Sequence, residues 1–340
     1  MNNQLDVFDE HTKRFSDQIR DWLHKTPAAV PLIVLLCSTL VFGVLVGGKF
    51  FTPFALTLIL QQVATVGIVA LAQSLVILTA GIDLSVGAIM VFSSVVMGQF
   101  TFRYGLPVEF SVMCGLFAGT LMGGINGILV AFMRLPPFIV TLGTWQIFLA
   151  ANFLYSENET IRGRDIAEKA ELLQFFGQKI NIGGAIFTYG VILMIGLALS
   201  LAYMMRHTAF GRHVYAVGDD ANAAELSGVQ TKRVLISVYA LCGLICAFAG
   251  WVLIGRIGSV SPTSGQMMNI DAITAVVIGG ISLFGGRGVV LGSLCGALIV
   301  GVFSLGLRMF GTDPQWTYLL IGLLIIVAVA IDQWIRKVAT

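Results

Sequence analysis

The feature that most constrains this chain is a series of apolar segments, each long enough to cross a lipid bilayer. A bilayer core of about 30 Å needs roughly 20 apolar residues in helical form, and scanning the 340 residues with such a window finds ten candidate spans. They lie near 28–47, 54–79, 86–104, 108–132, 138–155, 183–205, 234–256, 271–285, 289–310 and 315–333. The sequence therefore predicts an all-α polytopic membrane protein of about ten transmembrane helices, with nine or eleven as the alternatives.

The composition supports this reading. Charged residues make up 11% of the chain and hydrophobic residues 57%, whereas a soluble domain carries about 25% charged residues. The formal net charge of +2 excludes a broad basic face of the kind that binds nucleic acid. We therefore expect membrane lipid, and no nucleic acid, around the spans.

The distribution of Lys and Arg predicts the orientation. If the N-terminus is cytoplasmic, the inner segments hold twelve of the twenty basic residues, and such an excess marks the cytoplasmic side. Both termini are then inside. The predicted organisation is a cytoplasmic tail over 1–27, a transmembrane domain over 28–333 and a cytoplasmic tail over 334–340. The long periplasmic loop covers about 156–182, and the long cytoplasmic loop about 206–233.

The chain lacks the residues that common enzymes and metal sites require. No segment reads GxxxxGK[ST], so no phosphate-binding loop for ATP is predicted. The four histidines and five cysteines form no metal-ligand or disulfide pattern. We expect no catalytic residue, no metal and no cofactor. Charges within the spans are confined to helix ends, at Asp83, Asp271 and Arg308, which argues against a proton-driven carrier.

Amide, hydroxyl and aromatic side chains are the polar content of the spans. Gln62 and Gln73 are eleven residues apart and so share one face of the second span. A second set follows helical spacing in the fifth span: Thr141, Trp145, Phe148 and Asn152. Such groups suit a neutral, hydroxyl-rich solute such as a sugar, and we take them as candidate substrate-path residues. The alternative, that each one bonds a neighbouring helix, stays open.

Two stripes of glycine recur every four residues. They are Gly115, Gly119, Gly123 and Gly127 in the fourth span, and Gly288, Gly292 and Gly296 in the ninth. Four residues is close to one helical turn, so each stripe lets another backbone approach closely. The surface is either one that slides during transport or a static packing contact.

The cytoplasmic loop over 206–233 carries helix punctuation. Asp219 or Asp220 can cap a short helix over 221–227, and Gly228 suits its C-terminal end. A short alanine-rich helix of this kind offers a low surface on which a partner protein can dock.

Two glycine-rich turns carry polar residues. Gly81 and Gly87 bracket Asp83 and Ser85, so the chain can turn and cap the third span there. The second turn consists of Gly285, Gly286, Arg287 and Gly288 and lies at the inner surface. There the Arg287 guanidinium can bind lipid phosphates or a partner.

Four stretches resemble the permease subunits of ABC importers for monosaccharides, the ribose, xylose and galactose class. They are TAGIDLSVGAI at 79–89, LPPFIVTLGT at 135–144, GRHVYAVGDDANAAELSGV at 211–229 and AVVIGGISLFGGRG at 275–288. Within that class, the stretches at 99–105, 152–163 and 311–337 most resemble permeases that import fructose.

The resemblance implies partners and a mechanism. It implies a second permease copy, two cytoplasmic ATP-binding subunits that hydrolyse the ATP, a periplasmic sugar-binding protein, and a place in the bacterial inner membrane. Fructose is the expected sugar, with ribose or mannose as further substrates. The residues expected to couple to the ATPase are Gly211, Arg212, Asp220, Ala223, Ala224, Leu226, Ser227 and Gly228. The alternatives are an autonomous secondary sugar transporter, or an ABC permease for another small solute such as branched-chain amino acids.

Overall fold

The computed structural model describes residues 29–265 and 267–339, so the predicted tail over 1–27 lies outside the described residues. The long helices are α2 (Ala29–Val46), α3 (Pro53–Leu78), α5 (Val108–Met133), α6 (Pro137–Ser156), α8 (Tyr189–His207), α11 (Thr231–Ile257), α13 (Val290–Phe310) and α14 (Pro314–Ala339). The shorter helices are η1 (Gly47–Phe51), α4 (Val86–Phe102), α7 (Gly163–Lys169), η2 (Glu171–Gly177), α9 (Ala209–Asp219), α10 (Ala221–Leu226) and α12 (Met268–Ile278). Two short strands, β1 (Lys179–Ile182) and β2 (Ala185–Thr188), complete the fold.

Among the described residues, seven helical segments are long and apolar enough to cross a membrane. Three further apolar helices are shorter, namely α4, α12 and the part of α14 over 315–330. A helix thus stands at each of the ten predicted spans, while the count of ten crossings stays a prediction.

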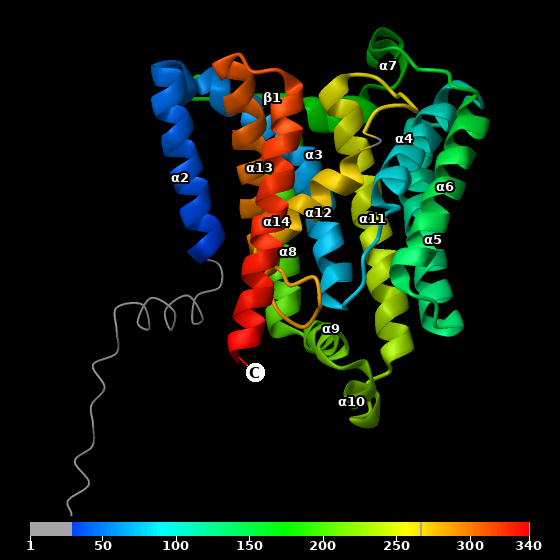
Figure 1. Cartoon of the computed structure of the whole chain (residues 1–340). Coiled ribbons are helices and arrows are strands. Elements are labelled where there is room, and N and C mark those ends of the chain that lie inside the picture. Colours follow the sequence, from blue (N-terminus) through cyan, green and yellow to red (C-terminus); the bar gives the residue numbers. More distant parts are fainter. Residues whose placement is uncertain (1–28, 266, 340) are drawn as a thin grey trace, which may run out of the picture.

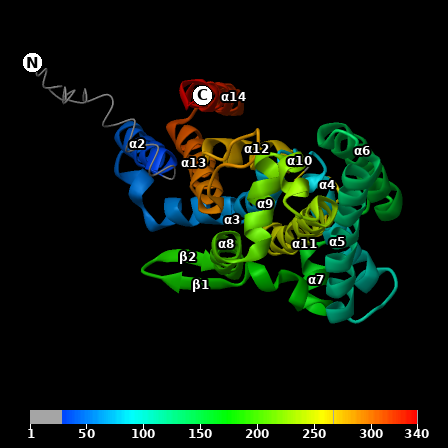
Figure 2. The same cartoon turned by 90° about the horizontal axis from the view of Figure 1, so that it is seen from below.

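The helices form a bundle with two different ends (Figure 1). The hairpin end carries β1, β2 and α7, and the α10 end carries α9 and α10. Seen from the α10 end, α9 and α10 lie across the bundle beside α8 and α11 (Figure 2). Helices α3 and α11 are largely buried and pack against each other. Helix α3 also packs against α12 and α13, and α11 against α4 and α5. Together α3 and α11 form the centre around which the more exposed α2, α6 and α14 stand.

Glycine permits a close contact between α5 and α11. Gly119, Gly123 and Gly127 of α5 face α11, and a β-carbon at Gly123 would overlap the carbonyl oxygen of Tyr239. Backbone therefore meets backbone along this stripe. The predicted stripe of the fourth span is confirmed as a surface of close contact within the chain, although its first member, Gly115, faces Met97 and Ser93 of α4.

The second predicted stripe is only partly a helix surface. Gly292 and Gly296 of α13 pack against Ala275 of α12 and against Gly279, which follows that helix. Gly288, however, precedes α13 and has a φ of +127°. Its place in the helical stripe was predicted wrongly, because such a φ lies outside the helical region that α13 requires.

The predicted eighth span over 271–285 ends too late. Helix α12 ends at Ile278, because Gly279 and Gly280 follow and Gly280 adopts a left-handed φ of +80°. The predicted tenth span over 315–333 covers the apolar part of α14 at 315–330, and the helix itself continues to Ala339.

The prediction of an all-α chain misses a β-hairpin. Strands β1 and β2 pair antiparallel around Gly183 and Gly184, whose φ values of +60° and +85° form a two-residue turn. The hairpin is tied to α3 because the amide of Ile186 donates to Thr57 Oγ1 at 2.8 Å. As a result the sixth helical span begins at Tyr189 and not near residue 183.

Candidate functional site

Helix α10 is the short capped helix that the sequence predicts. The carboxylate of Asp220 accepts hydrogen bonds from the amides of Asn222 and Ala223 at 2.8 and 3.0 Å. Gly228 follows with a left-handed φ of +87°. The side chain of Leu226 is 90% exposed, so the helix presents an uncovered apolar group at the α10 end.

The other candidate coupling residues divide by burial. Those with exposed positions are Arg212, Asp220, Ala223, Ser227 and Gly228, whereas Gly211 and Ala224 are buried. A β-carbon at Gly211 would overlap the carbonyl oxygen of Met205. Gly211 and Ala224 therefore position α9 and α10, and the exposed set is free to meet a partner.

Two interruptions of the helices face each other inside the bundle. The first break, over 79–85, separates α3 from α4, and the second break, over 279–289, separates α12 from α13. Both begin with the same helix-ending motif: the amide of Gly81 donates to Val76 at 3.1 Å, and that of Ile281 to Val276 at 3.3 Å. The residue before each donor has a positive φ, +61° at Ala80 and +80° at Gly280.

Helix α9 closes these breaks at a junction of backbone groups. The amide of Gly286 donates to the carbonyl oxygen of Leu78 at 3.1 Å, which joins the two breaks directly. A β-carbon at Gly218 of α9 would overlap that same oxygen, and one at Gly285 would lie 2.6 Å from the carbonyl oxygen of Gly218. We call Leu78, Gly218, Gly285 and Gly286 the Gly218 junction. No side chain fits within it, so α9 rests directly on both breaks.

A second contact ties α9 to the second break. The hydroxyl of Tyr215 donates to the carbonyl oxygen of Gly288 at 2.9 Å. Burial raises the pKa of Tyr215, so the hydroxyl stays protonated and remains a donor at neutral pH. The neighbouring Arg287 is exposed at the α10 end.

The first break contains a buried polar network. Asp83 is fully buried, and its Oδ1 accepts from the amide and the hydroxyl of Ser85 at 2.7 and 2.6 Å. Asn126 of α5 donates to Ser85 Oγ at 2.8 Å. With its amide oriented to satisfy both partners, Gln73 pairs with the backbone N–H and C=O of Asp83 at 3.1 Å each. Asp83 thus fixes the start of α4.

The start of α12 meets this network. Asn269, in the first turn of α12, donates to the carbonyl oxygen of Leu84 at 3.1 Å. A β-carbon at Gly87 would lie 3.3 Å from the Asn269 amide nitrogen. The N-terminal ends of α4 and α12 therefore lie against each other within the bundle, where helix termini leave N–H groups without intrahelical partners.

The candidate path residues of α6 lie beside this contact. Thr141 donates to the carbonyl oxygen of Ile82 at 2.9 Å, and Asn152 to that of Pro262 at 2.9 Å. Trp145 and Asn152 line a cavity of about 10 Å³, room for about one water. Phe148 is buried on the same helix. Gln62 lies elsewhere, where Arg308 of α13 donates to its side-chain oxygen.

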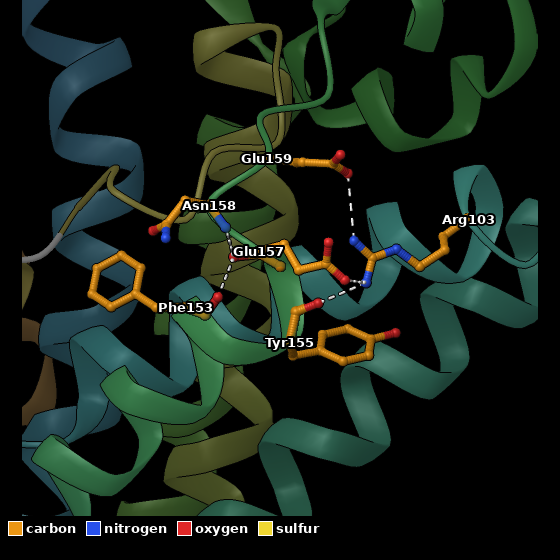
Figure 3. Close-up of polar contacts among 7 residues, drawn as sticks. Arg103, Phe153, Tyr155, Glu157, Asn158 and Glu159 are labelled. Atoms are coloured by element: carbon orange, nitrogen blue, oxygen red, sulfur yellow. Dashed lines mark hydrogen bonds and ion pairs between the residues drawn. The ribbon is translucent and has the colours of Figure 1, made fainter.

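At the hairpin end, one cation joins α4 to α6 (Figure 3). Arg103 donates to the carbonyl oxygen of Tyr155 at 2.9 Å and lies 3.3 and 3.4 Å from the carboxylates of Glu157 and Glu159. Glu157 and Asn158 both have positive φ values. Since α6 ends here in two left-handed residues, the Arg103 contacts hold an otherwise unfavourable turn in place.

The chain is similar to bacterial import permeases along nearly its whole length. Residues 55–329 match the family described as branched-chain amino acid transport system / permease component. The chain belongs to this permease family. It is 70% identical to the fructose import permease protein of Rhizobium meliloti over 332 residues, 98% of this chain and 92% of the relative.

More distant relatives import other compounds. The chain is 34% identical to the ribose import permease protein of Escherichia coli strain K12, over 92% of this chain and 94% of the relative. It is 32% identical to the D-allose transport system permease protein of the same strain, over 89% and 91%. The relatives and the apolar helices together show that the permease is a multi-pass protein of the bacterial inner membrane.

The structure of the permease brings together some predicted site residues and adds others. Gln73, Asp83, Ser85 and Thr141 meet at the first break, although they were assigned to separate groups from the sequence. Helix α9 was missed. Two features of the sequence could have revealed it. Thr208 is an N-cap residue, and its hydroxyl accepts from the amide of Gly211 at 3.3 Å. An apolar face then follows at Phe210, Val214 and Val217.

Proposed function

We propose that this permease is the membrane subunit of an ABC importer and that it carries a monosaccharide, with fructose first among the candidates, into the cytoplasm. The observation that carries this proposal is the 70% identity to a fructose import permease over 98% of the chain. The neutral amides and hydroxyls around the first break support it, because a sugar needs donors and acceptors rather than a fixed counter-charge.

The energy enters from partner subunits. In this proposal the α10 end faces the cytoplasm, and the exposed face of α10 docks on an ATP-binding subunit, one for each of two permease copies. The hairpin end faces the periplasm and receives a sugar-binding protein. Movement of α10 passes through Asp220 into α9, and from α9 into the Gly218 junction between the two breaks. The second break then shifts against the first, which changes access to the path.

Labelled-sugar uptake tests the proposal. Cells that carry or lack this chain are given labelled fructose, with ribose, mannose, galactose and leucine as unlabelled competitors. We expect uptake only with the chain present, and competition by sugars but not by leucine. Competition by leucine alone would favour the amino-acid function that the family description names. Accumulation by liposomes that hold this chain without an ATPase would favour a secondary carrier.

Leu226→Arg tests the docking surface. Because Leu226 is 90% exposed, the substitution leaves the folded chain intact and places a charge on the proposed apolar contact. We expect uptake to fall about tenfold or more, as for loss of an interface anchor, at an unchanged membrane level of the protein. Gln230→Arg, which is also exposed at the α10 end, is the matched control and should transport normally. Normal uptake by Leu226→Arg would contradict the docking role.

A further inference from the structure

A polar cavity opens at the hairpin end, away from the two breaks. Its volume is about 130 Å³, and its walls come from α3, η2, the hairpin and α11. A single water needs only about 10–15 Å³ of such space, so the cavity holds several waters or a small polyol. Lys179 and Arg256 line it and are both exposed, and the cavity therefore communicates with solvent.

The wall of the cavity is built on a close backbone contact. A β-carbon at Gly177 of η2 would overlap the carbonyl oxygen of Gly255 on α11. This contact sets the position of η2, and it leaves the space beside Arg256 free of a side chain from either glycine. Thr188, which is 8% exposed, closes the cavity from β2.

The polar groups around the cavity include both donors and acceptors. Gln61 and Thr188 offer each kind, and the Arg256 guanidinium adds planar donors. Asp271 of α12 and Arg308 of α13 both lie within electrostatic range of Arg256, one attracting and the other repelling it. Arg308 is also held by Gln62. An anion would need donors only, whereas a sugar uses both kinds.

These charges lie at the ends of spanning helices. They lie in the last turns of α11 and α13 and in the first turn of α12, and ionisable groups of spanning helices mark solute paths in membrane proteins. On α3, one turn beyond Gln61, Thr65 is fully buried and its hydroxyl has no hydrogen-bond partner among the described residues. Polar groups thus continue from the cavity towards the interior of the bundle.

We propose that this cavity, the vestibule, is a monosaccharide-binding site that receives the sugar at the periplasmic mouth, with Gln61, Thr188 and Arg256 bonding its hydroxyls. Arg308 is a positioning residue, because its guanidinium donates to the side chain of Gln62, the neighbour of Gln61. The inference rests on the proposed function, since it assigns a first binding step to that same transport.

Uptake kinetics test the vestibule. Gln61→Ala and Arg256→Gln should raise the KM for labelled fructose about tenfold or more, as expected for loss of a hydrogen bond to a neutral or charged group. The maximal rate should change less than about twofold, because the breaks and the α10 end are untouched. Gln178→Ala and Arg162→Gln are the matched controls. Both residues are exposed at the hairpin end and do not line the cavity.

A second measurement remains informative even if a variant transports poorly. Thr188→Cys is treated with a membrane-impermeant thiol reagent in the assembled importer, and labelling of position 188 is followed by peptide mass. Fructose should slow this labelling and leucine should not. ATPase activity stimulated by the sugar-loaded binding protein should stay within about twofold of the unmodified importer in Arg256→Gln.

The outcomes separate the two proposals. If the unmodified importer accumulates no sugar, the proposed function fails and the vestibule with it. If it accumulates sugar but the variants keep their KM and fructose does not slow labelling at position 188, only the vestibule is overturned. Loss of stimulated ATPase activity in Arg256→Gln would show a docking surface for the binding protein instead, and that too overturns the inference.

Discussion

The two helix breaks begin alike and are filled differently. Each starts with a left-handed residue and the same backbone hydrogen bond, between Gly81 and Val76 in one and between Ile281 and Val276 in the other. The first break is then occupied by side chains, centred on Asp83. The second presents the backbone of Gly285 and Gly286 to α9.

This difference assigns the breaks separate mechanical roles. Buried hydrogen bonds between side chains fix one geometry, because breaking any of them leaves a polar group without a partner. The van der Waals contacts between the glycines of the second break and α9 carry no such penalty when they slide. We infer that the first break is the fixed element and the second break the one that follows α9.

The largest effect is expected at the Gly218 junction. In Gly218→Ala the added methyl group would overlap the Leu78 carbonyl oxygen, and forcing a group into filled space costs about 1–3 kcal/mol. Uptake should fall about tenfold or more, while ATP hydrolysis continues without stimulation by the sugar-loaded binding protein. Gly196→Ala is the control, since Gly196 of α8 has open space around its Cα. Normal coupling in Gly218→Ala would remove α9 from the relay.

The second prediction concerns the side chains of the first break. Ser85→Ala removes the hydroxyl that donates to Asp83 and accepts from Asn126. Each buried group left unpaired costs about 1–3 kcal/mol, so the melting temperature of the purified permease should fall clearly. In Ser74→Ala, the control, the lost hydroxyl bonds only the carbonyl oxygen of Leu71 in the same helix. If both variants melt alike, the network does not fix the break.

Much of the fold could be predicted from the sequence. Bilayer thickness imposes a length on apolar segments, so most long spans were found within a few residues, as α3, α5 and α11 show. Helix α10 was predicted because Asp220 and Gly228 punctuate it locally. The hairpin was missed because its strands are four residues each, too short for a periodic signal beside an apolar span.

The candidate site was less predictable. Gln73 and Asp83 lie ten positions apart and Thr141 lies 59 residues from Ile82, yet all of them meet at the first break. Such meetings depend on which helices are neighbours, and hydropathy carries no information on that. The glycines of the second break were noted, but α9, the element they contact, was not predicted.

The third prediction exchanges the left-handed residues of the two breaks. Gly280→Ala should lower the stability by about 1–2 kcal/mol, because a β-carbon is unfavourable at a φ of +80°. Ala80→Gly should be near neutral or raise the stability by up to about 1 kcal/mol, since the relieved strain is partly offset by the greater freedom of glycine in the unfolded chain. Thermal melting of the two variants measures both signs. Equal destabilisation would show that the motifs are not equivalent.

The smallest effect is expected from Tyr215→Phe. The substitution keeps the ring of Tyr215 on α9 and removes only its hydrogen bond to the Gly288 carbonyl oxygen, which contributes about 0.5–1.5 kcal/mol. Since burial raises the pKa of Tyr215, the hydroxyl is a donor throughout the neutral range, and the ratio of variant to unmodified uptake should not change between pH 6 and 8 (roughly the range in which an ordinary tyrosine also stays protonated). We expect uptake to fall about twofold to fivefold, less than in Gly218→Ala. A loss as large as that of Gly218→Ala would mean that the second break is held to α9 by this hydroxyl and not by the glycine backbone.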